Sequence, residues 1–367
     1  MNARRDIVVI GASAGGVEAL RTLVGHLPAG LPAAVLVVLH LPPQSDSALP
    51  AILDRCGPLA ARIAEHGLPI EPGNIYVAKP GRHLVVADGH LVLTKGPREN
   101  GHRPAVDVLF RTAARTFGPR VIAVVLSGAL DDGTAGLLAV AARGGVTVAQ
   151  DPGDAHYPAM PESAIEHAAP DHVLPAEQIA ALIDRRCREQ VDPDAVPEVP
   201  IGMQTESQMS EFERDPVTSE ESPGVPSSLT CPDCAGALFE VGTEDIVRFR
   251  CRVGHAWTAE SLSEAQGLAF EGALWMAMRS LEERAALGRQ MADSARARGN
   301  SMSATRFEQM ADDAAGSARL IHELMERVDV RDLGGSQVRE PQPPRSRRYV
   351  GQAAADVTDS PVADEGP

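Results

Sequence analysis

Residues 7–17 read IVVIGASAGGV, and this stretch decides the fold expected for the first half of the chain. The apolar run 7–10 is typical of a short buried strand, the glycines after it predict a tight turn, and 17–27 has the apolar spacing of a helix. Ser13 lies at the tip of the turn. The spacing of Gly11, Ser13 and Gly15 fits a nucleophile elbow, in which small neighbours let the backbone bend sharply and expose a serine hydroxyl. The stretch therefore favours a hydrolase.

The same glycines suit a second kind of site, because a Gly-rich turn between strand and helix also binds the phosphates of a dinucleotide. Two positions argue against this alternative. Ser13 stands where the dinucleotide fingerprint has its second glycine, and His40 ends the next strand, where an acidic ribose ligand is expected. The hydrolase is the stronger interpretation, and both stay open at this point.

Strand and helix patterns alternate from residue 6 to about 186, which predicts an α/β fold with a doubly wound, mostly parallel sheet. Hydrophobic residues make up 44% of the chain and aromatic residues 3%, so the core must be built from aliphatic side chains. Asp88-Gly89 predicts a hairpin turn. We expect strands at 7–10, 34–39, 74–77, 84–86, 91–94, 121–126, 146–149 and 172–174, and helices at 17–27, 48–55, 105–117, 136–143 and 176–186.

The rest of the chain divides by composition. Residues 191–230 carry nine acids and one base with repeated Pro and Ser, which indicates an acidic flexible linker. Apolar and small residues at alternating spacings of four and three then predict two paired helices turning near Gly299-Asn300. We expect an α/β domain at 1–190, the linker at 191–230, a cysteine-rich unit at 231–258, a helical hairpin at 259–330 and a disordered tail at 331–367.

A nucleophilic serine needs a base and a carboxylate that orients the base. His40 ends the strand 34–39, and Asp131-Asp132 follow the strand 121–126. In a doubly wound sheet the carboxyl ends of the strands share one edge, so Ser13, His40 and Asp132 should meet there. Each has a simpler explanation: Ser13 as a turn residue, His40 as a polar strand end, and the aspartates as caps of the next helix. Three such residues at matching strand ends favour the catalytic interpretation.

Six blocks of sequence, in order, carry a resemblance to a known family: IGASAGG (10–16), HLPP (40–43), HRPAVDVLF (102–110), SGALDDG (127–133), AQDP (149–152) and MP (160–161). Residues 6–186 resemble the catalytic domain of CheB-type chemotaxis methylesterases. The resemblance implies protein-glutamate methylesterase activity on methylated chemoreceptor helices, often with glutamine deamidation and without a cofactor for catalysis. It assigns a Ser–His–Asp triad to Ser13, His40 and Asp132.

Other expectations follow from this resemblance. Backbone amides at Ala14 and Ala129 are placed to bind the oxyanion. We expect Arg103, Asp107, Met160 and Pro161 to shape the substrate groove, and His102 and His156 to be polar loop residues. Well-known members carry an N-terminal receiver domain. Because the first strand begins near residue 6, we expect no receiver domain here, and control by the C-terminal half or by an unknown regulatory protein partner.

Four residues in two short segments predict a metal site: Cys231, Cys234, Cys251 and His255. Three thiolates and an imidazole suit tetrahedral zinc with no open position, which indicates a structural site. The alternative is a reduced dithiol turn beside an unrelated histidine. A zinc ribbon can also bind nucleic acid, but Arg248, Arg250 and Arg252 form only a thin basic patch. The resemblance to relatives with similar tails implies a docking or regulatory role for this unit.

Charge and cysteine usage limit the remaining possibilities. The formal net charge of −16 argues against general binding to nucleic acid or to an anionic membrane. No apolar stretch approaches the about 18 residues that span a bilayer, and no targeting segment precedes the first strand. Five cysteines do not fit a secreted disulfide framework, so we expect a cytoplasmic protein. The leading hypothesis is a serine esterase; the alternative is a catalytically inactive adaptor that only docks onto receptor helices.

Overall fold

The computed structural model describes residues 3–45, 47–192, 197–211, 223–242 and 246–327. Seven parallel strands form the central sheet in the order β10–β9–β8–β2–β3–β5–β4. This confirms the predicted α/β fold with a mostly parallel sheet. The strands are β2 (Ile7–Ala12), β3 (Ala34–Leu39), β4 (Ala60–Ile63), β5 (Asn74–Val77), β8 (Val121–Val125), β9 (Val146–Gln150) and β10 (His172–Leu174).

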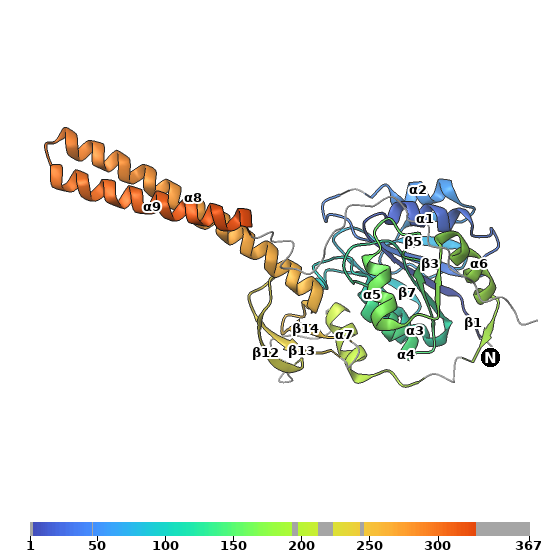
Figure 1. Ribbon diagram of the computed structural model, residues 1–367. Coiled ribbons are helices and arrows are strands. Elements are labelled where there is room, and N and C mark those ends of the chain that lie inside the picture. The colour runs from blue at the N-terminus through green and yellow to red at the C-terminus, as the bar shows by residue number, and fades with distance from the viewer. Residues whose placement is uncertain (1–2, 46, 193–196, 212–222, 243–245, 328–367) are drawn as a thin grey trace, which may run out of the picture. The chain divides into compact units, whose positions relative to one another are not determined.

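Helices cover both faces of the sheet (Figure 1). Because side chains alternate along a strand, β2 sends Val8 and Ile10 into one aliphatic core and Ile7 and Val9 into the other. The first core is closed by α1 (Gly16–Gly25), α2 (Leu49–Cys56) and α6 (Ala176–Cys187). The second is closed by α3 (Val106–Phe117), α4 (Thr134–Ala142) and α5 (Ala159–Ala168). A 3₁₀ turn, η1 (Gly118–Arg120), leads from α3 into β8.

A hairpin of β6 (His83–Ala87) and β7 (His90–Thr94) leaves the sheet after β5. Asp88 and Gly89 form its turn with φ of 48° and 76°, left-handed values that a two-residue turn of this kind requires. The hairpin packs on α3, and the loop 95–105 returns from it to the start of that helix. The predicted Asp-Gly hairpin is therefore present.

The expectation of a flexible linker over 191–230 is wrong for three described stretches. β11 (Gln190–Val191) pairs with β1 (Ala3–Arg4), α7 (Ile201–Glu211) packs against α3, and β12 (Val225–Thr230) joins the next sheet. The acids of α7 are ordered because buried arginines from other elements pair with them, a compensation that composition does not reveal. Residues 193–196 and 212–222 lie outside the described part of the chain, as does the predicted tail at 331–367.

We call residues 225–258 the ribbon module, an antiparallel sheet of β12, β13 (Ala237–Glu240), β14 (Arg248–Cys251) and β15 (Ala256–Thr258). The predicted helical hairpin follows as α8 (Ala259–Ala297) and α9 (Ser301–Arg327), which turn at Gly299. None of the described helices combines the length and apolar composition needed to cross a membrane. Small residues line the contact between the two helices: Ala285, Gly288, Ala292 and Ala295 on α8, and Ala304, Ala311, Ala314 and Ala318 on α9.

Candidate active site

Ser13 lies in the turn between β2 and α1, as the elbow pattern predicts. Gly15 has a φ of 68°, a left-handed value that favours glycine, and it caps the start of α1. Gly11 passes so close to α3 that a Cβ there would lie 2.2 Å from Val106 Cγ1. The Ser13 amide donates to the carbonyl oxygen of Ser127 at 2.9 Å, which fixes the turn to the end of β8. Gly15 is therefore needed for the turn, and Gly11 for the close approach of β2 to α3.

His40 lies beside this turn because β2 and β3 are in register. Ala12 pairs with Leu39, and the His40 amide donates to the carbonyl oxygen of Ala12 at 3.2 Å. The next residues of the two strands, Ser13 and His40, are therefore neighbours at the carboxyl edge of the sheet. The strand-end argument accordingly places these two segments correctly.

His40 Nε2 donates to Asp132 Oδ2 at 2.8 Å. Only 6% of the histidine side chain and 2% of the aspartate side chain are exposed. Because Nε2 carries the proton given to the carboxylate, Nδ1 is the nitrogen free to accept one. Nδ1 is buried and has no hydrogen-bond partner, and within the described residues no hydrogen bond joins it to Ser13. Such contacts are often loose before substrate binds and tighten in the complex.

Four donors hold the Asp132 carboxylate. Besides His40, the amides of Val106 and Asp107 at the start of α3 donate to it at 2.7 and 3.2 Å, and Asn100 Nδ2 donates at 3.1 Å. Burial alone would raise the pKa of Asp132, but the hydrogen bond and the charge of His40 outweigh it and lower the pKa to about 2. Asp132 is therefore a fixed carboxylate at neutral pH.

The expectation that Asp107, Arg103 and Met160 shape a substrate groove is not supported by their contacts. Asp107 is fully buried, and its Oδ1 accepts the amides of Gly133 and Gly136 at 3.0 and 2.6 Å. Arg103 donates to the carbonyl oxygen of Gly96 at 2.9 Å, and Met160 is buried. The sequence places these residues near the site but does not show whether their side chains line a groove or pack inside the fold.

His102 and Asn100 contact His40 and Asp132, which the sequence does not indicate. The ring of His102 stacks on that of His40, with centroids 3.6 Å apart and 12° between the planes. Burial lowers the pKa of His102 to about 4, so its ring is neutral at neutral pH. Asn100, with a φ of 52°, donates Nδ2 both to Asp132 and to Asp107 Oδ2. Both residues come from a loop with no periodic pattern, and nothing in their spacing predicts these contacts.

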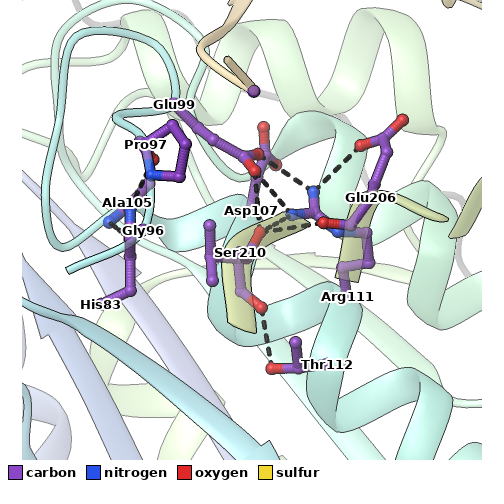
Figure 2. Close-up of polar contacts among 12 residues, drawn as sticks. His83, Gly96, Pro97, Glu99, Ala105, Asp107, Arg111, Thr112, Glu206 and Ser210 are labelled. Carbon is purple, nitrogen blue, oxygen red and sulfur yellow. Dashed lines mark hydrogen bonds and ion pairs between the residues drawn. The ribbon is translucent and has the colours of Figure 1, made fainter. Parts of the chain in front are cut away.

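His83 fixes both ends of the loop that carries Asn100 and His102. Its Nε2 donates to the carbonyl oxygen of Pro97 at 2.8 Å, and its Nδ1 accepts the amide of Ala105 at 3.2 Å (Figure 2). Burial lowers the pKa of His83 to about 4. The loop therefore depends on a neutral imidazole.

The predicted metal ligands come together in the ribbon module. The ligand atoms of Cys231, Cys234, Cys251 and His255 all lie within 4.8 Å of one another. The Sγ atoms of Cys234 and Cys251 are 3.7 Å apart, and Cys251 Sγ is 3.6 Å from His255 Nδ1. These separations are far longer than a disulfide bond of about 2.05 Å. The cluster is a Cys₃His set that could hold a metal ion.

The α/β half of the chain is similar to known proteins. The model of the CheB methylesterase family matches residues 8–183. The chain is 39% identical over 182 residues to the protein-glutamate methylesterase/protein-glutamine glutaminase of Symbiobacterium thermophilum, covering 49% of this chain and 50% of that one. It therefore spans about half the length of that relative. A putative protein of the same name from Leptospira interrogans is 38% identical over 181 residues, which are 49% of this chain and 94% of the relative.

A solved structure is also similar. The crystal structure of the Thermotoga maritima CheB methylesterase catalytic domain is 36% identical in sequence, and the match covers 49% of this chain and 97% of that domain with a TM-score of 0.47.

Proposed function

This chain belongs to the CheB methylesterase family, and we propose that it hydrolyses γ-glutamyl methyl esters on chemoreceptor helices to glutamate and methanol. We assign Ser13 as the nucleophile, His40 as the base and Asp132 as the carboxylate that orients it. One observation carries the assignment: His40, the neighbour of Ser13 at the strand ends, gives Nε2–H to a buried carboxylate and keeps Nδ1 without a partner. This is the division of roles that a serine hydrolase needs.

The reaction follows from these positions. Ser13 Oγ attacks the ester carbonyl carbon while His40 Nδ1 takes the hydroxyl proton, which forms a tetrahedral oxyanion. The C–O bond to methanol then breaks, and His40 gives its proton to the departing oxygen. Water, deprotonated by His40, attacks the acyl-enzyme and releases glutamate and free Ser13. Asp132 stabilises the imidazolium in both halves of the cycle.

Two backbone amides are available for the oxyanion. Within the described residues, the amides of Ala14 and Ala129 have no hydrogen-bond acceptor, and Ala14 directly follows the nucleophile. One such donor contributes about 2.7–4 kcal/mol to transition-state stability. A backbone donor needs no particular side chain, so alanine serves at either position.

Deamidation of glutamine is a second candidate activity. The names of the relatives include protein-glutamine glutaminase. The same attack on a γ-carboxamide would produce the same acyl-enzyme, with His40 protonating ammonia in place of methanol. Release of ammonia from unmethylated receptor, lost together with methanol release in one Ser13 variant, would show that one site performs both reactions.

The test of the main proposal is methanol release from methylated receptor. We expect Ser13→Ala to abolish release while circular dichroism and thermal unfolding remain those of the parent protein. Ser45→Ala is a matched control, because Ser45 is another loop serine whose hydroxyl only donates to the carbonyl oxygen of Pro42. A Ser13→Ala protein as active as the parent would refute the nucleophile. A parent protein that binds methylated receptor without releasing methanol would favour the inactive adaptor.

We propose that the Cys₃His cluster binds structural zinc. Zn–S bonds of about 2.3 Å and Zn–N bonds of about 2.0–2.1 Å at tetrahedral angles separate two sulfurs by about 3.8 Å and a sulfur from a nitrogen by about 3.6 Å. The observed 3.7 and 3.6 Å fit these edges. The ribbon module has a small apolar core, so a metal would supply much of its stability. One equivalent of zinc in the parent, lost in a Cys231→Ser, Cys234→Ser double variant, is the expected result; unchanged zinc content would refute the site.

A further inference from the structure

Asn100 joins the ribbon module to the triad carboxylate. On one side, its Nδ2 donates to Asp132 Oδ1 at 3.1 Å. On the other side, its Oδ1 accepts the amide of Thr258 at 3.1 Å and the hydroxyl of Ser261 at 3.3 Å. Thr258 is the N-cap of α8, and it forms a capping box with Ser261. One buried amide group therefore connects the start of α8 to the carboxylate that orients His40.

A second contact runs in parallel with the first. The hydroxyl of Thr258 donates to Asp131 Oδ1 at 2.9 Å, and Asp131 is 4% exposed. The backbone also pairs: the Asn100 amide donates to the carbonyl oxygen of Ala256, and the Ala256 amide donates to that of Arg98. β15 and the N-cap of α8 thus bind both the loop 95–105 and the aspartate next to Asp132.

A buried ion cluster holds the ribbon module against this loop. Glu99 pairs with Arg111 of α3 at 2.7 Å and with Arg250 of β14 at 3.1 Å, and Glu206 of α7 pairs with Arg250 at 2.9 Å. Figure 2 shows Glu99, Arg111 and Glu206 meeting in this cluster. The side chains of Glu99 and Arg250 are each 1% exposed. Separating these charges would leave some of them buried and unpaired, which is strongly unfavourable.

We propose that the ribbon module positions the hydrolytic site: the N-cap of α8 holds Asn100 through the Thr258 backbone amide, and Asn100 holds the Asp132 carboxylate in the orientation that His40 requires. This inference rests on the function proposed above. Asn100 and Thr258 are positioning residues, because neither lies at the reacting atoms. Displacement of a catalytic group by about 1 Å can cost about 100-fold in rate, so a loose carboxylate slows the chemistry without weakening substrate binding.

These contacts give the ribbon module a physical means of regulating catalysis at Asp132. Any event that separates β15 from the loop 95–105, such as loss of metal from the Cys₃His cluster or a partner pulling on α8, would break the contacts of Asn100 Oδ1. Asn100 then holds Asp132 less firmly, and the carboxylate depends more on the amides of Val106 and Asp107. The module would therefore act on kcat, in contrast to a docking surface, which would act on KM.

The experiment uses the full chain and methanol release from methylated receptor. Thr258→Val keeps the shape of the side chain and removes the hydroxyl that binds Asp131 and caps α8. Loss of these two contacts frees the N-cap, whose backbone amide holds Asn100 Oδ1. We expect kcat to fall about 10- to 100-fold with KM unchanged, and Thr258→Ser to restore it. Asn100→Ala should have the same effect. If Thr258 acts through Asn100, the double variant should be no slower than Asn100→Ala alone. Ser227→Ala, which removes a hydroxyl bound to Leu238 within the ribbon module, is the matched control and should match the parent.

A second readout does not depend on activity. The amides of Val106 and Asp107 donate to Asp132, so their hydrogen exchange reports how firmly the carboxylate is held. We expect exchange at both amides to speed up at least tenfold in Thr258→Val and to stay at the parental rate in Ser227→Ala. A parent protein without methanol release would refute the proposed function, and the exchange rates would still decide this inference.

Three results would overturn the inference. The first is a Thr258→Val protein with parental kcat and parental exchange at Val106 and Asp107. The second is a raised KM with unchanged kcat, which would make the module a docking surface. The third is full additivity of Asn100→Ala and Thr258→Val. If Thr258→Val does not fold, Asn100→Ala still decides the inference, because it removes the link to Asp132 from the other side; parental kcat in that variant would overturn the inference.

Discussion

Mild acid should loosen the loop 95–105 through His83. This imidazole donates Nε2–H to the carbonyl oxygen of Pro97 and accepts the amide of Ala105 at Nδ1. Protonation puts a hydrogen on Nδ1, so the ring can no longer accept from Ala105. It also places a charge in a fully buried position. The folded protein therefore resists protonation of His83, and the unfolded chain does not.

The sign and size of the effect follow from the pKa values. Burial lowers the pKa of His83 from 6.5 to about 4 in the folded protein. Below the unfolded value the unfolded chain binds the proton first, so stability falls as the pH drops from 6.5 toward 4 and then levels off. Between about pH 7 and about pH 5 the loss is about 2 kcal/mol for this group. His102 titrates in the same direction, because burial also lowers its pKa to about 4.

Urea unfolding of the parent and of His83→Gln at several pH values measures this difference. Glutamine offers one donor and one acceptor at similar positions and does not titrate in this range. We expect His83→Gln to lose about 2 kcal/mol less than the parent between about pH 7 and about pH 5. His90→Gln is the matched control, because His90 lies exposed on the same hairpin, and it should keep the parental slope. Equal pH slopes in His83→Gln and the parent would refute the reasoning.

Three further changes have defined outcomes. Gly128→Ala would place a Cβ 2.0 Å from Met160 Sδ and 2.9 Å from Ser13 Cβ, so methanol release should fall at least about tenfold while circular dichroism stays parental. Glu99→Ala leaves buried arginines without their carboxylate and should lower the free energy of unfolding by about 3–5 kcal/mol in urea titrations. Gly288→Leu overpacks the contact with Ala311, so hydrogen exchange should accelerate in α8 and α9 while methanol release is retained.

The sequence predicts the central sheet well because its strands are continuous aliphatic runs buried on both faces. β3 lies at 34–39, as predicted, and β5 lies at 74–77. β4 is missed because its residues alternate between exposed and half-buried at one edge of the sheet, and Ala60-Ala61 gives no strand signal. α5 is missed because Pro158 at its N-cap and Pro161 in its first turn are typical of loops, although the first turn of a helix tolerates proline.

The sequence predicts those residues of the candidate site that follow a strand of the central sheet. Ser13, His40 and Asp132 each follow a recognisable strand, and the shared carboxyl edge brings their segments together. Asn100 and His102 follow no strand of the central sheet. Their positions depend on the hairpin of β6 and β7, on His83 and on β15, which is more than 150 residues away along the chain. No local pattern contains that information.

The C-terminal half shows why charge counted along the sequence misleads. Arg248 and Arg250 look like a thin basic patch for nucleic acid, and the acids of 191–230 look like a solvated linker. In the fold these two features neutralise each other, because Glu206 of the linker pairs with both arginines at 2.9–3.0 Å. Arg248 is 8% exposed and Arg250 is 1% exposed, so neither presents its charge to a polyanion. The arginines of β14 therefore serve to seat the ribbon module on the loop that holds Asp132, which is where the inference about Asn100 begins.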